Sequence, residues 1–252
     1  MGALLLIPAL IISLLWYMPG IKLQGENAVI KKKDYWWCAL VAGLLTCCVL
    51  IVVTELLWDA VVKRTGLSGL PLELVGSFFR AALLEESFKF LGAIMSVDRV
   101  KPTRKIDFVM LFGLIGLTYN VFEKLFLGGA AAIVGAVIPM HLMWQFNQGG
   151  HFYEHKKAVL VGDKGRVGKE KFAFLFIPFF IHGCWDALIS VGVYLMGDKF
   201  PGVVQALGFV MIIGIIVYGI VYSIKTFRNV KKLAVENESF PETETPESAP
   251  VE

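Results

Sequence analysis

The stretch LLEESFKF, residues 83–90, places two adjacent carboxylates and an ammonium inside a segment that is otherwise apolar for more than a helical turn on either side. The whole chain has this contrast, since 56% of its 252 residues are hydrophobic and 18% are charged. The apolar residues gather in blocks of roughly 20, the length of a membrane-spanning helix. The sequence therefore predicts an all-α, polytopic membrane helix bundle that buries Glu85, Glu86 and Lys89.

We expect about seven transmembrane helices around a polar cavity in the bundle core. The first block has no basic region ahead of it and no small-residue cleavage site behind it, which indicates a retained span. A long polar loop is expected over residues 147–170, between the fifth and sixth blocks. The expected blocks cover residues 3–18, 35–57, 72–97, 108–126, the segment from the LGGAAAIVG turn to 146, 172–196 and 203–224.

Basic residues are concentrated in alternate loops. By the positive-inside rule, this bias predicts an amino terminus outside and a carboxyl terminus in the cytoplasm. We assign residues 1–235 to the transmembrane domain, with its core at 72–196, and expect the acidic tail 236–252 to be disordered. The basic residues of the predicted cytoplasmic loops are Lys22, Lys31, Lys32, Lys33, Arg99, Lys101, Arg104, Lys105, Lys156, Lys157, Lys164, Arg166, Lys169, Lys171, Lys225, Arg228, Lys231 and Lys232.

Composition excludes several classes of protein. The net charge of +3 is small and its basic residues lie in loops, so nucleic-acid binding is not expected. All four cysteines lie within apolar blocks, which argues against a disulfide framework. The chain has no visible repeat of 20–50 residues, no Gly-rich phosphate loop and no zinc-finger spacing.

The quoted stretch has a definite geometry if it is helical. Lys89 lies one turn from both Glu85 and Glu86, whereas the two carboxylates point about 100° apart. One carboxylate can then face a cavity while the other is tied to the scaffold. An ammonium nearby can keep a glutamate ionised and able to take a proton from water. The alternative is a structural ion pair between helices.

Three later blocks also carry polar residues. Asn120 and Glu123 share a face in YNVFEKLFL, as catalytic support or as a helix end reaching the interface. His141 lies in PMHLMWQF, where a lone histidine is also compatible with simple packing. His182 and Asp186 stand four residues apart in FFIHGCWDAL, a spacing that lets the carboxylate orient the imidazole. Because buried ionisable groups are costly in a membrane, we expect these residues to share one cavity.

Such a set of residues suits three functions. It fits a zinc hydrolase, with His141, His182 and Glu86 as candidate metal ligands. It also fits metal-free hydrolysis, with glutamate as general base and His or Asn stabilising the oxyanion. Proton or cation transport would use the same residue types. There is no HExxH motif, which weakens the zinc hypothesis without excluding it.

The order of motifs resembles that of the PrsW family of intramembrane proteases. The resemblance rests on EESFK, FEK, His141 and HGCWD in successive blocks and covers about residues 72–196. It implies a superfamily with the type II CAAX prenyl endopeptidases and the seven-span scaffold subunit of gamma-secretase. The CAAX motif EExxxR would require arginine at position 90, where this chain has Phe90, so prenylated substrates are not implied.

Carried over to this chain, the resemblance implies a peptidase of a prokaryotic plasma membrane that cleaves single-span membrane proteins. Glu85 or Glu86 would activate water, Lys89 would hold the second carboxylate, and His141 and His182 would line the site. Glu123 and Asp186 would complete or orient it. From the predicted orientation, which places these two residues in the outer part of their spans, we expect the site to be reached from the outer side. The alternatives are a non-catalytic scaffold and a transporter, although the lack of a visible inverted repeat disfavours transport.

Overall fold

The structure is a computed structural model that describes residues 11, 14–18, 22, 32–49, 55–126, 138–236 and 238–240. Within these ranges the chain is helical apart from turns and one isolated β-bridge between Arg104 and Ser239, which confirms the all-α prediction. The elements are α2 (Lys32–Cys48), α3 (Glu55–Thr65), α4 (Gly69–Gly76), η2 (Ser77–Leu84), α5 (Glu85–Val100), α6 (Lys105–Phe126), α8 (Met140–Leu160), α9 (Lys164–Leu195) and α10 (Gly202–Glu236).

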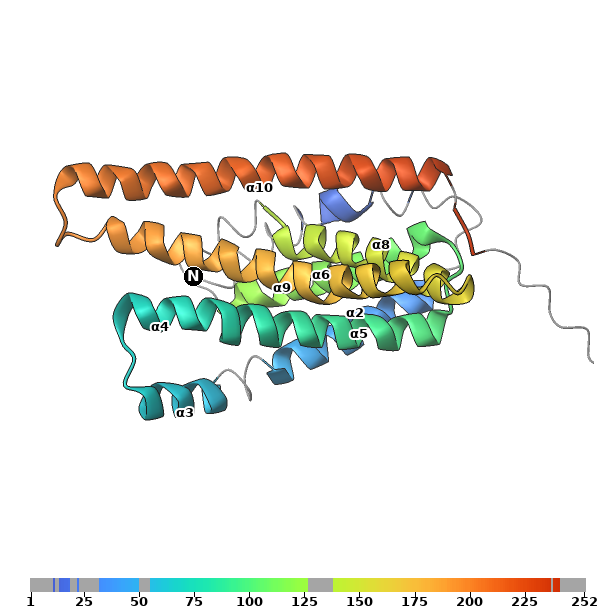
Figure 1. Ribbon diagram of the computed structural model, residues 1–252, viewed down its shortest axis with the longest axis horizontal. Helices are drawn as coiled ribbons and strands as arrows, with labels where there is room; N and C mark the ends of the chain where they lie inside the picture. The colour runs from blue at the N-terminus through green and yellow to red at the C-terminus, as the bar shows by residue number, and fades with distance from the viewer. Residues whose placement is uncertain are drawn as a thin grey trace, which may run out of the picture.

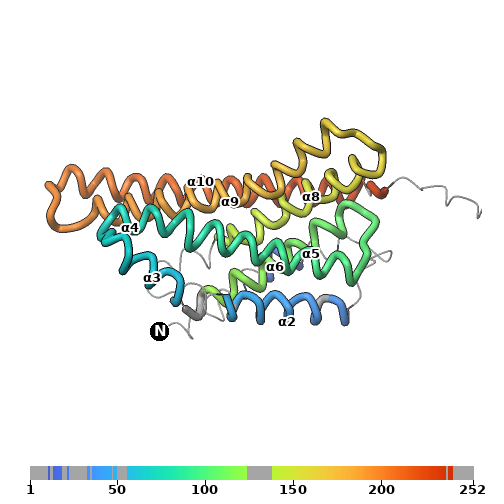
Figure 2. The backbone as a smooth tube through the Cα atoms, turned by 60° about the horizontal axis from the view of Figure 1, so that its bottom comes forward, coloured from blue at the N-terminus to red at the C-terminus, as the bar shows by residue number. Residues whose placement is uncertain are grey.

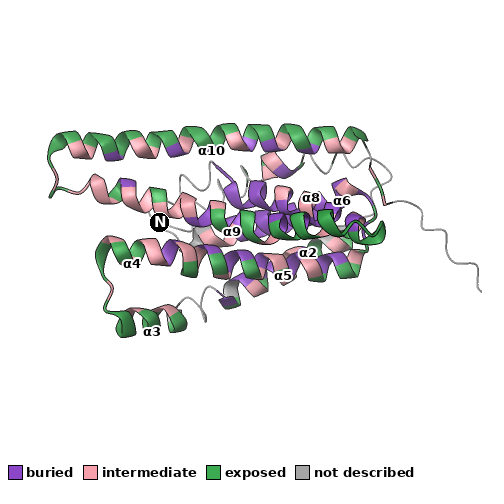
Figure 3. Cartoon of the chain, in the orientation of Figure 1, coloured by how far each residue is buried: buried purple, intermediate pink, exposed green. Residues whose placement is uncertain are grey.

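The helices form an elongated bundle whose centre is α6 packed against α8 (Figure 1). Helix α9 covers α8, α10 lies along α9, and α2 packs on α5 and α6 on the side away from α10 (Figure 2). In its most apolar stretch, 83% of α6 is buried, against 28% of α9 and 17% of α10. Buried residues accordingly concentrate on α6 and α8, while α10 turns a mostly exposed surface outward (Figure 3).

Within the described ranges, three helices are long and apolar enough to cross a membrane: Lys105–Glu123 of α6, and the whole of α9 and α10. The apolar part of α2, Trp36–Thr46, is shorter. The first expected block lies mostly outside the described residues, as does the turn LGGAAAIVG. The count of seven spans therefore stays a prediction.

One expected boundary is wrong, and another lies partly outside the described residues. The second block includes residues of α2 and α3, and residues 50–54 between them are outside the described ranges. The loop expected at 147–170 is instead the second half of α8, a short turn, and the start of α9. The low hydropathy of this region predicted a loop, but its polar side chains bond to other parts of the protein and are compatible with helices. Gln148 Nε2 donates to the Phe174 carbonyl at 2.8 Å. The Asp163 side chain caps α9 by accepting from the Arg166 amide.

Helices α4, η2 and α5 form one continuous rod over residues 69–100. Its middle turn, η2, is π-helical, with wider i→i+5 hydrogen bonding than the α-helices on either side. The rod lies close to α9 at Gly183, where any Cβ atom would overlap the ring of Phe78. This close approach places the first residues of α5, Glu85 and Glu86, next to His182 of α9.

One end of the bundle, where α5, α8 and α10 end and α6 and α9 begin, carries most of the basic residues; we call it the basic end. Glu238–Phe240, here called the clasp, packs there. The Glu238 carboxylate accepts from Lys157 at 2.7 Å and from Lys105 at 3.3 Å, and Phe240 stacks on Tyr153 with ring centroids 4.8 Å apart. The clasp thus packs on the bundle near the start of the acidic segment; residues 241–252 lie outside the described ranges, and the expected disorder of the tail stays a prediction.

Candidate active site

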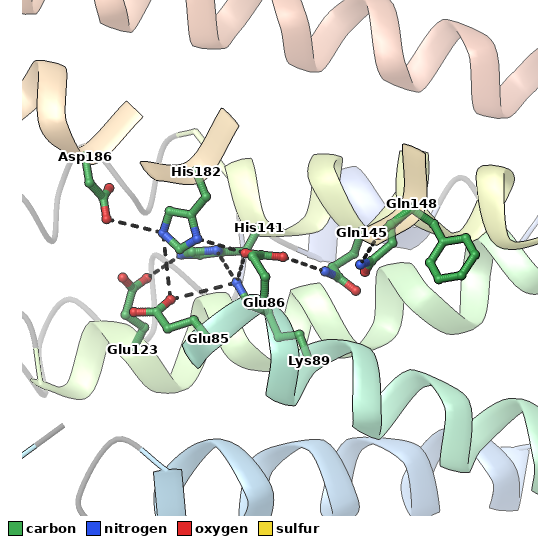
Figure 4. A network of polar contacts seen from close by, with 10 residues as sticks. Glu85, Glu86, Lys89, Glu123, His141, Gln145, Gln148, His182 and Asp186 are labelled. Atoms are coloured by element: carbon green, nitrogen blue, oxygen red, sulfur yellow. Dashed lines mark hydrogen bonds and ion pairs between the residues drawn. The ribbon is translucent and has the colours of Figure 1, made fainter. Parts of the chain in front are cut away.

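A buried polar cluster lies about halfway along the rod (Figure 4). Four helices contribute to it, although their residues are up to a hundred positions apart in the sequence. The cluster brings together nearly all the residues that the sequence nominated: Glu85, Glu86 and Lys89 from α5, Glu123 from α6, His141 from α8, and His182 and Asp186 from α9.

Glu86 is held from three directions. Its Oε1 accepts a hydrogen bond from Lys89 Nζ at 2.5 Å and another from His182 Nδ1 at 2.8 Å, and its Oε2 accepts from Gln145 Nε2 at 3.1 Å. The side chain is almost fully buried. A carboxylate with this many charge-assisted partners is fixed in place and has little freedom to bind anything else.

Glu85 differs from its neighbour in having few partners. Its Oε2 is buried and has no hydrogen-bond partner among the described residues. This oxygen lies 3.8 Å from Lys89 Nζ and 3.8 Å from His182 Nε2, close enough for electrostatic attraction and too far for a hydrogen bond. Of the two carboxylates, Glu86 is thus tied to its neighbours, and Glu85 has an oxygen without a hydrogen-bond partner among the described residues.

Each histidine is oriented by a carboxylate. Lys89 Nζ donates to His141 Nδ1 at 2.9 Å, so we infer that the proton of the neutral ring is on Nε2, which lies 3.1 Å from Glu123 Oε2. His182 donates through Nδ1 to Glu86, and its Nε2 lies 3.3 Å from Asp186 Oδ2. Carboxylates in this position fix the ring orientation of histidines that bind metals or move protons.

Aromatic rings enclose the cluster. Lys89 Nζ lies 4.2 Å from the centroid of the Tyr119 ring, a cation–π contact, and Trp144 lies 4.7 Å from His182 between ring centroids. The two histidine rings are 5.0 Å apart. Neither Tyr119 nor Trp144 was predicted from the sequence. Tyr119 directly precedes the nominated residue Asn120, and Trp144 follows the nominated residue His141 by three positions.

Two further polar residues, Asn120 and Gln145, lie on the helices α6 and α8 that contribute to the cluster. Asn120 is buried on α6, three residues before Glu123, as its spacing predicted. Gln145, one turn after His141, is a full member of the cluster that the sequence analysis did not propose. The side chains of Asp186 and Glu123 are 33% and 17% exposed, more than those of Glu85 and Glu86, so the cluster is most accessible on their side.

The donor set fits a divalent metal ion. Glu85, His141 and His182 each offer a ligand atom, all are buried, and these atoms lie within 4.8 Å of one another. The set of two histidines and a glutamate is one that catalytic zinc uses. It contains Glu85 where the sequence analysis had nominated Glu86. In addition, four carboxylates here face one lysine, and a further cation would offset this excess of negative charge.

Comparison with known proteins points the same way. The model of the PrsW family of intramembrane metalloproteases matches residues 31–218, a range that includes every helix of the cluster. No curated protein and no solved structure matches the chain significantly. The family match favours the enzyme over the scaffold and transporter hypotheses. The chain belongs to the PrsW family, and it is an integral membrane protease that acts on membrane-embedded protein substrates.

Proposed function

We propose that the polar cluster hydrolyses a peptide bond of a single-span membrane protein, with Glu85 as the carboxylate that meets the attacking water. One observation carries this assignment: Glu85 Oε2 is buried, faces the histidines and has no hydrogen-bond partner in the described part of the chain. A carboxylate in this state can accept a proton or a ligand bond without first breaking another interaction.

The other cluster residues then have distinct roles. Glu86, Lys89 and Gln145 form the fixed support on which Glu85 and the histidines are aligned. Glu123 and Asp186 hold the rings of His141 and His182 in a fixed orientation. Asn120 is proposed as a hydrogen-bond donor to the oxyanion, by its residue type and its position on α6.

We propose Glu85, His141 and His182 as the residues that would hold a metal ion. When bound, a zinc ion would polarise the scissile carbonyl and strengthen water as a nucleophile. The family description and the donor set support metal dependence. A metal-free reaction remains the alternative, in which Glu85 acts as the general base and His182 donates to the oxyanion.

The proposed orientation places the amino terminus outside and the basic end in the cytoplasm of a prokaryotic cell. It is supported by the concentration of lysine and arginine at that end. The substrate would then enter from the outer side or laterally, where Glu123 and Asp186 are partly exposed. Cysteines placed at 123 and 186 should react with an impermeant thiol reagent added outside, and reaction only from the cytoplasmic side would contradict this orientation.

The function is tested by cleavage of a panel of single-span proteins in liposomes. We expect wild type to cut at least one of them, and Glu85→Gln and His182→Ala to cut none while remaining folded. A strong chelator added to wild type, followed by zinc, separates the two chemistries: loss and recovery of cleavage supports the metal set. Equal cleavage by wild type and both variants would refute the catalytic assignment.

A further inference from the structure

Polar residues continue along α8 from the cluster toward the basic end. Gln145 extends the network from Glu86, and Gln148 follows it one turn later (Figure 4). Asn147 and His151 occupy the adjoining face of the same helix. Polar residues are costly to bury inside a membrane protein unless they line water or serve a site. Gln148, Asn147 and His151 have no role in the proposed protease site.

A cavity lies beside this polar line, between α6, α8 and α10; it is the larger of the two that concern this line. It has a volume of about 380 Å³. At its rim on the basic end stand Asn229, Lys232 and Glu236, all exposed. Asn147 and His151 also line it, nearer the middle of α8. The cavity therefore connects the aqueous surface of the basic end with the middle of α8.

A second cavity, of about 200 Å³, lies between α8, α9 and α10. It shares Asn147 and His151 with the first, so the two are neighbours along the bundle. Its lining reaches Trp144, whose ring is 4.7 Å from that of His182. Together the two cavities form a series from the surface of the basic end to the edge of the polar cluster.

Two groups lining the smaller cavity call for a hydrogen-bonding ligand. Trp144 Nε1 and Gln148 Oε1 are buried, and neither has a hydrogen-bond partner within the described ranges. One group is a donor and the other an acceptor, and both residues are only 2% exposed. Buried polar groups of this kind are normally satisfied by ordered water, and both cavities exceed the ~30 Å³ that one water occupies.

The place where the cavities meet is defined by a tether between helices. Asn147 Nδ2 donates to Tyr222 Oη at 2.6 Å and to Thr226 Oγ1 at 3.4 Å, both on α10. Because this tether joins α8 to α10 between the two cavities, we expect the passage to admit water and to exclude an extended peptide. A substrate chain and water would thus reach the cluster by different routes.

We infer that these cavities form a water conduit, which leads from the basic end past Asn147 and Gln148 to Trp144 and delivers the hydrolytic water to the side of His182. The use of this water rests on the proposed peptidase function, whereas the conduit itself does not. Its function would be to supply the second reactant, water, while the opposite side of the cluster receives the peptide.

Thiol accessibility tests the conduit without any substrate. In full-length protein whose four native cysteines are replaced by serine, Gln148→Cys is treated with a small charged methanethiosulfonate in nanodiscs. The matched control is Met143→Cys, on the same helix and fully buried in the apolar core. We expect position 148 to react at least tenfold faster. Equal, slow reaction at both positions would overturn the inference.

Blocking the conduit gives the second test. A side chain at Gly150 has room, since its Cβ would meet only Val109 at 3.8 Å, and it would project into the larger cavity. Gly150→Leu should slow labelling at position 148 about tenfold and lower kcat with KM unchanged. Gly168→Leu, at an exposed glycine with nothing within 4 Å, is the control and should change neither.

The results separate the conduit from the protease proposal. Slowed labelling in a protein that cleaves no substrate would support the conduit and count against the proposed function. Unchanged labelling in Gly150→Leu would overturn the conduit whatever the cleavage result. Slowed labelling with an unchanged kcat would refute its role in supplying the reaction.

Discussion

The bundle contains two buried networks of charged residues, and they differ in balance. At the basic end the buried carboxylates of Asp107 and Glu154 have cations of their own: Asp107 accepts two hydrogen bonds from Arg104, both at 2.8 Å, and Glu154 is paired with Lys105 and Arg166. In the cluster around Glu85, four carboxylates face one lysine and two histidines. The balanced network holds helix ends together, whereas the unbalanced one keeps capacity for a cation, a proton or a substrate.

This difference teaches how to distinguish structural from functional charge inside a membrane protein. Burial alone does not do so, because Asp107 is as inaccessible as Glu86. The informative property is an oxygen without a partner, as at Glu85. Ion pairs that satisfy each other contribute to the fold, and a residual unpaired group indicates a place where another molecule binds.

The largest expected effect comes from Glu85→Gln, which removes the available charge and preserves the shape. We expect the cleavage rate to fall by about 10²–10⁴-fold, the usual contribution of a general base, with the melting temperature unchanged or raised. Proteoliposome cleavage and thermal unfolding measure the two properties. Glu238→Gln, in the clasp, is the control and should cleave at the wild-type rate. If Glu85→Gln cleaved at the wild-type rate, the cluster around Glu85 would have to be regarded as structural, like the network at the basic end.

Lys89→Met should have the next largest effect, on stability. It leaves Glu86 as a buried carboxylate without its ammonium, and breaking such a pair costs about 3–5 kcal/mol in the free energy of unfolding. Denaturant unfolding in detergent measures the change. The double variant Lys89→Met, Glu86→Gln should recover most of it. No recovery in the double variant would show that Lys89 stabilises the bundle in another way.

Asp107→Asn tests whether the balanced network at the basic end contributes to stability without affecting cleavage. The change weakens two hydrogen bonds from Arg104, and we expect a loss of about 1.5–3 kcal/mol in unfolding free energy. Cleavage per folded molecule should stay at the wild-type value, because Asp107 lies in the first turn of α6, at the opposite end of the helix from Glu123. Loss of activity in the folded fraction would mean that the networks are coupled.

The smallest expected effect is the response of the clasp to acid. Burial raises the pKa of Glu238, but the hydrogen bond from Lys157 and the charge of Lys105 outweigh it and hold this pKa below its ordinary value of 4.5. The clasp is therefore fully stabilised above pH 4.5 and weakens as the pH falls through the lower, folded-state value. Since these ion pairs are partly exposed, we expect less than about 1 kcal/mol. Hydrogen exchange of the Phe240 amide measures it, and Glu238→Gln should abolish its dependence on pH.

Much of this site could be predicted because motif spacing maps directly onto helix faces. Asp186 lies beside His182 as their i, i+4 spacing indicated, and Glu123 lies in the shared cluster, 3.1 Å from His141, as expected for buried ionisable groups. The choice between Glu85 and Glu86 could not be made, since Lys89 is one turn from both and only the packed structure fixes its rotamer. Tyr119 and Trp144 were missed because an aromatic residue in an apolar helix carries no signal of what its ring contacts.

The fold was less predictable where a polar segment is helical, as in the second half of α8. Hydropathy assigned the second half of α8 to a loop, but Gln148 is buried with a partner on α9, and that contact lies outside any local window. The π-helical turn η2 had no signature in SFFRAALL either. Phe78 of this segment packs against Gly183 of α9, a contact between residues that are distant in the sequence.

The π-helical turn also determines which changes in chain length the enzyme can tolerate. A π-helix holds more residues per turn than an α-helix, so deletion of Ala81 or Ala82 can be absorbed if η2 narrows to α-helical geometry. The same deletion at Ser87 would rotate Lys89 by about 100° relative to Glu86 and separate the pair. The rod thus contains η2, which can lose a residue without disturbing the site, directly before the start of α5, which cannot. An alignment of related sequences can therefore place a gap in η2 but not at the start of α5.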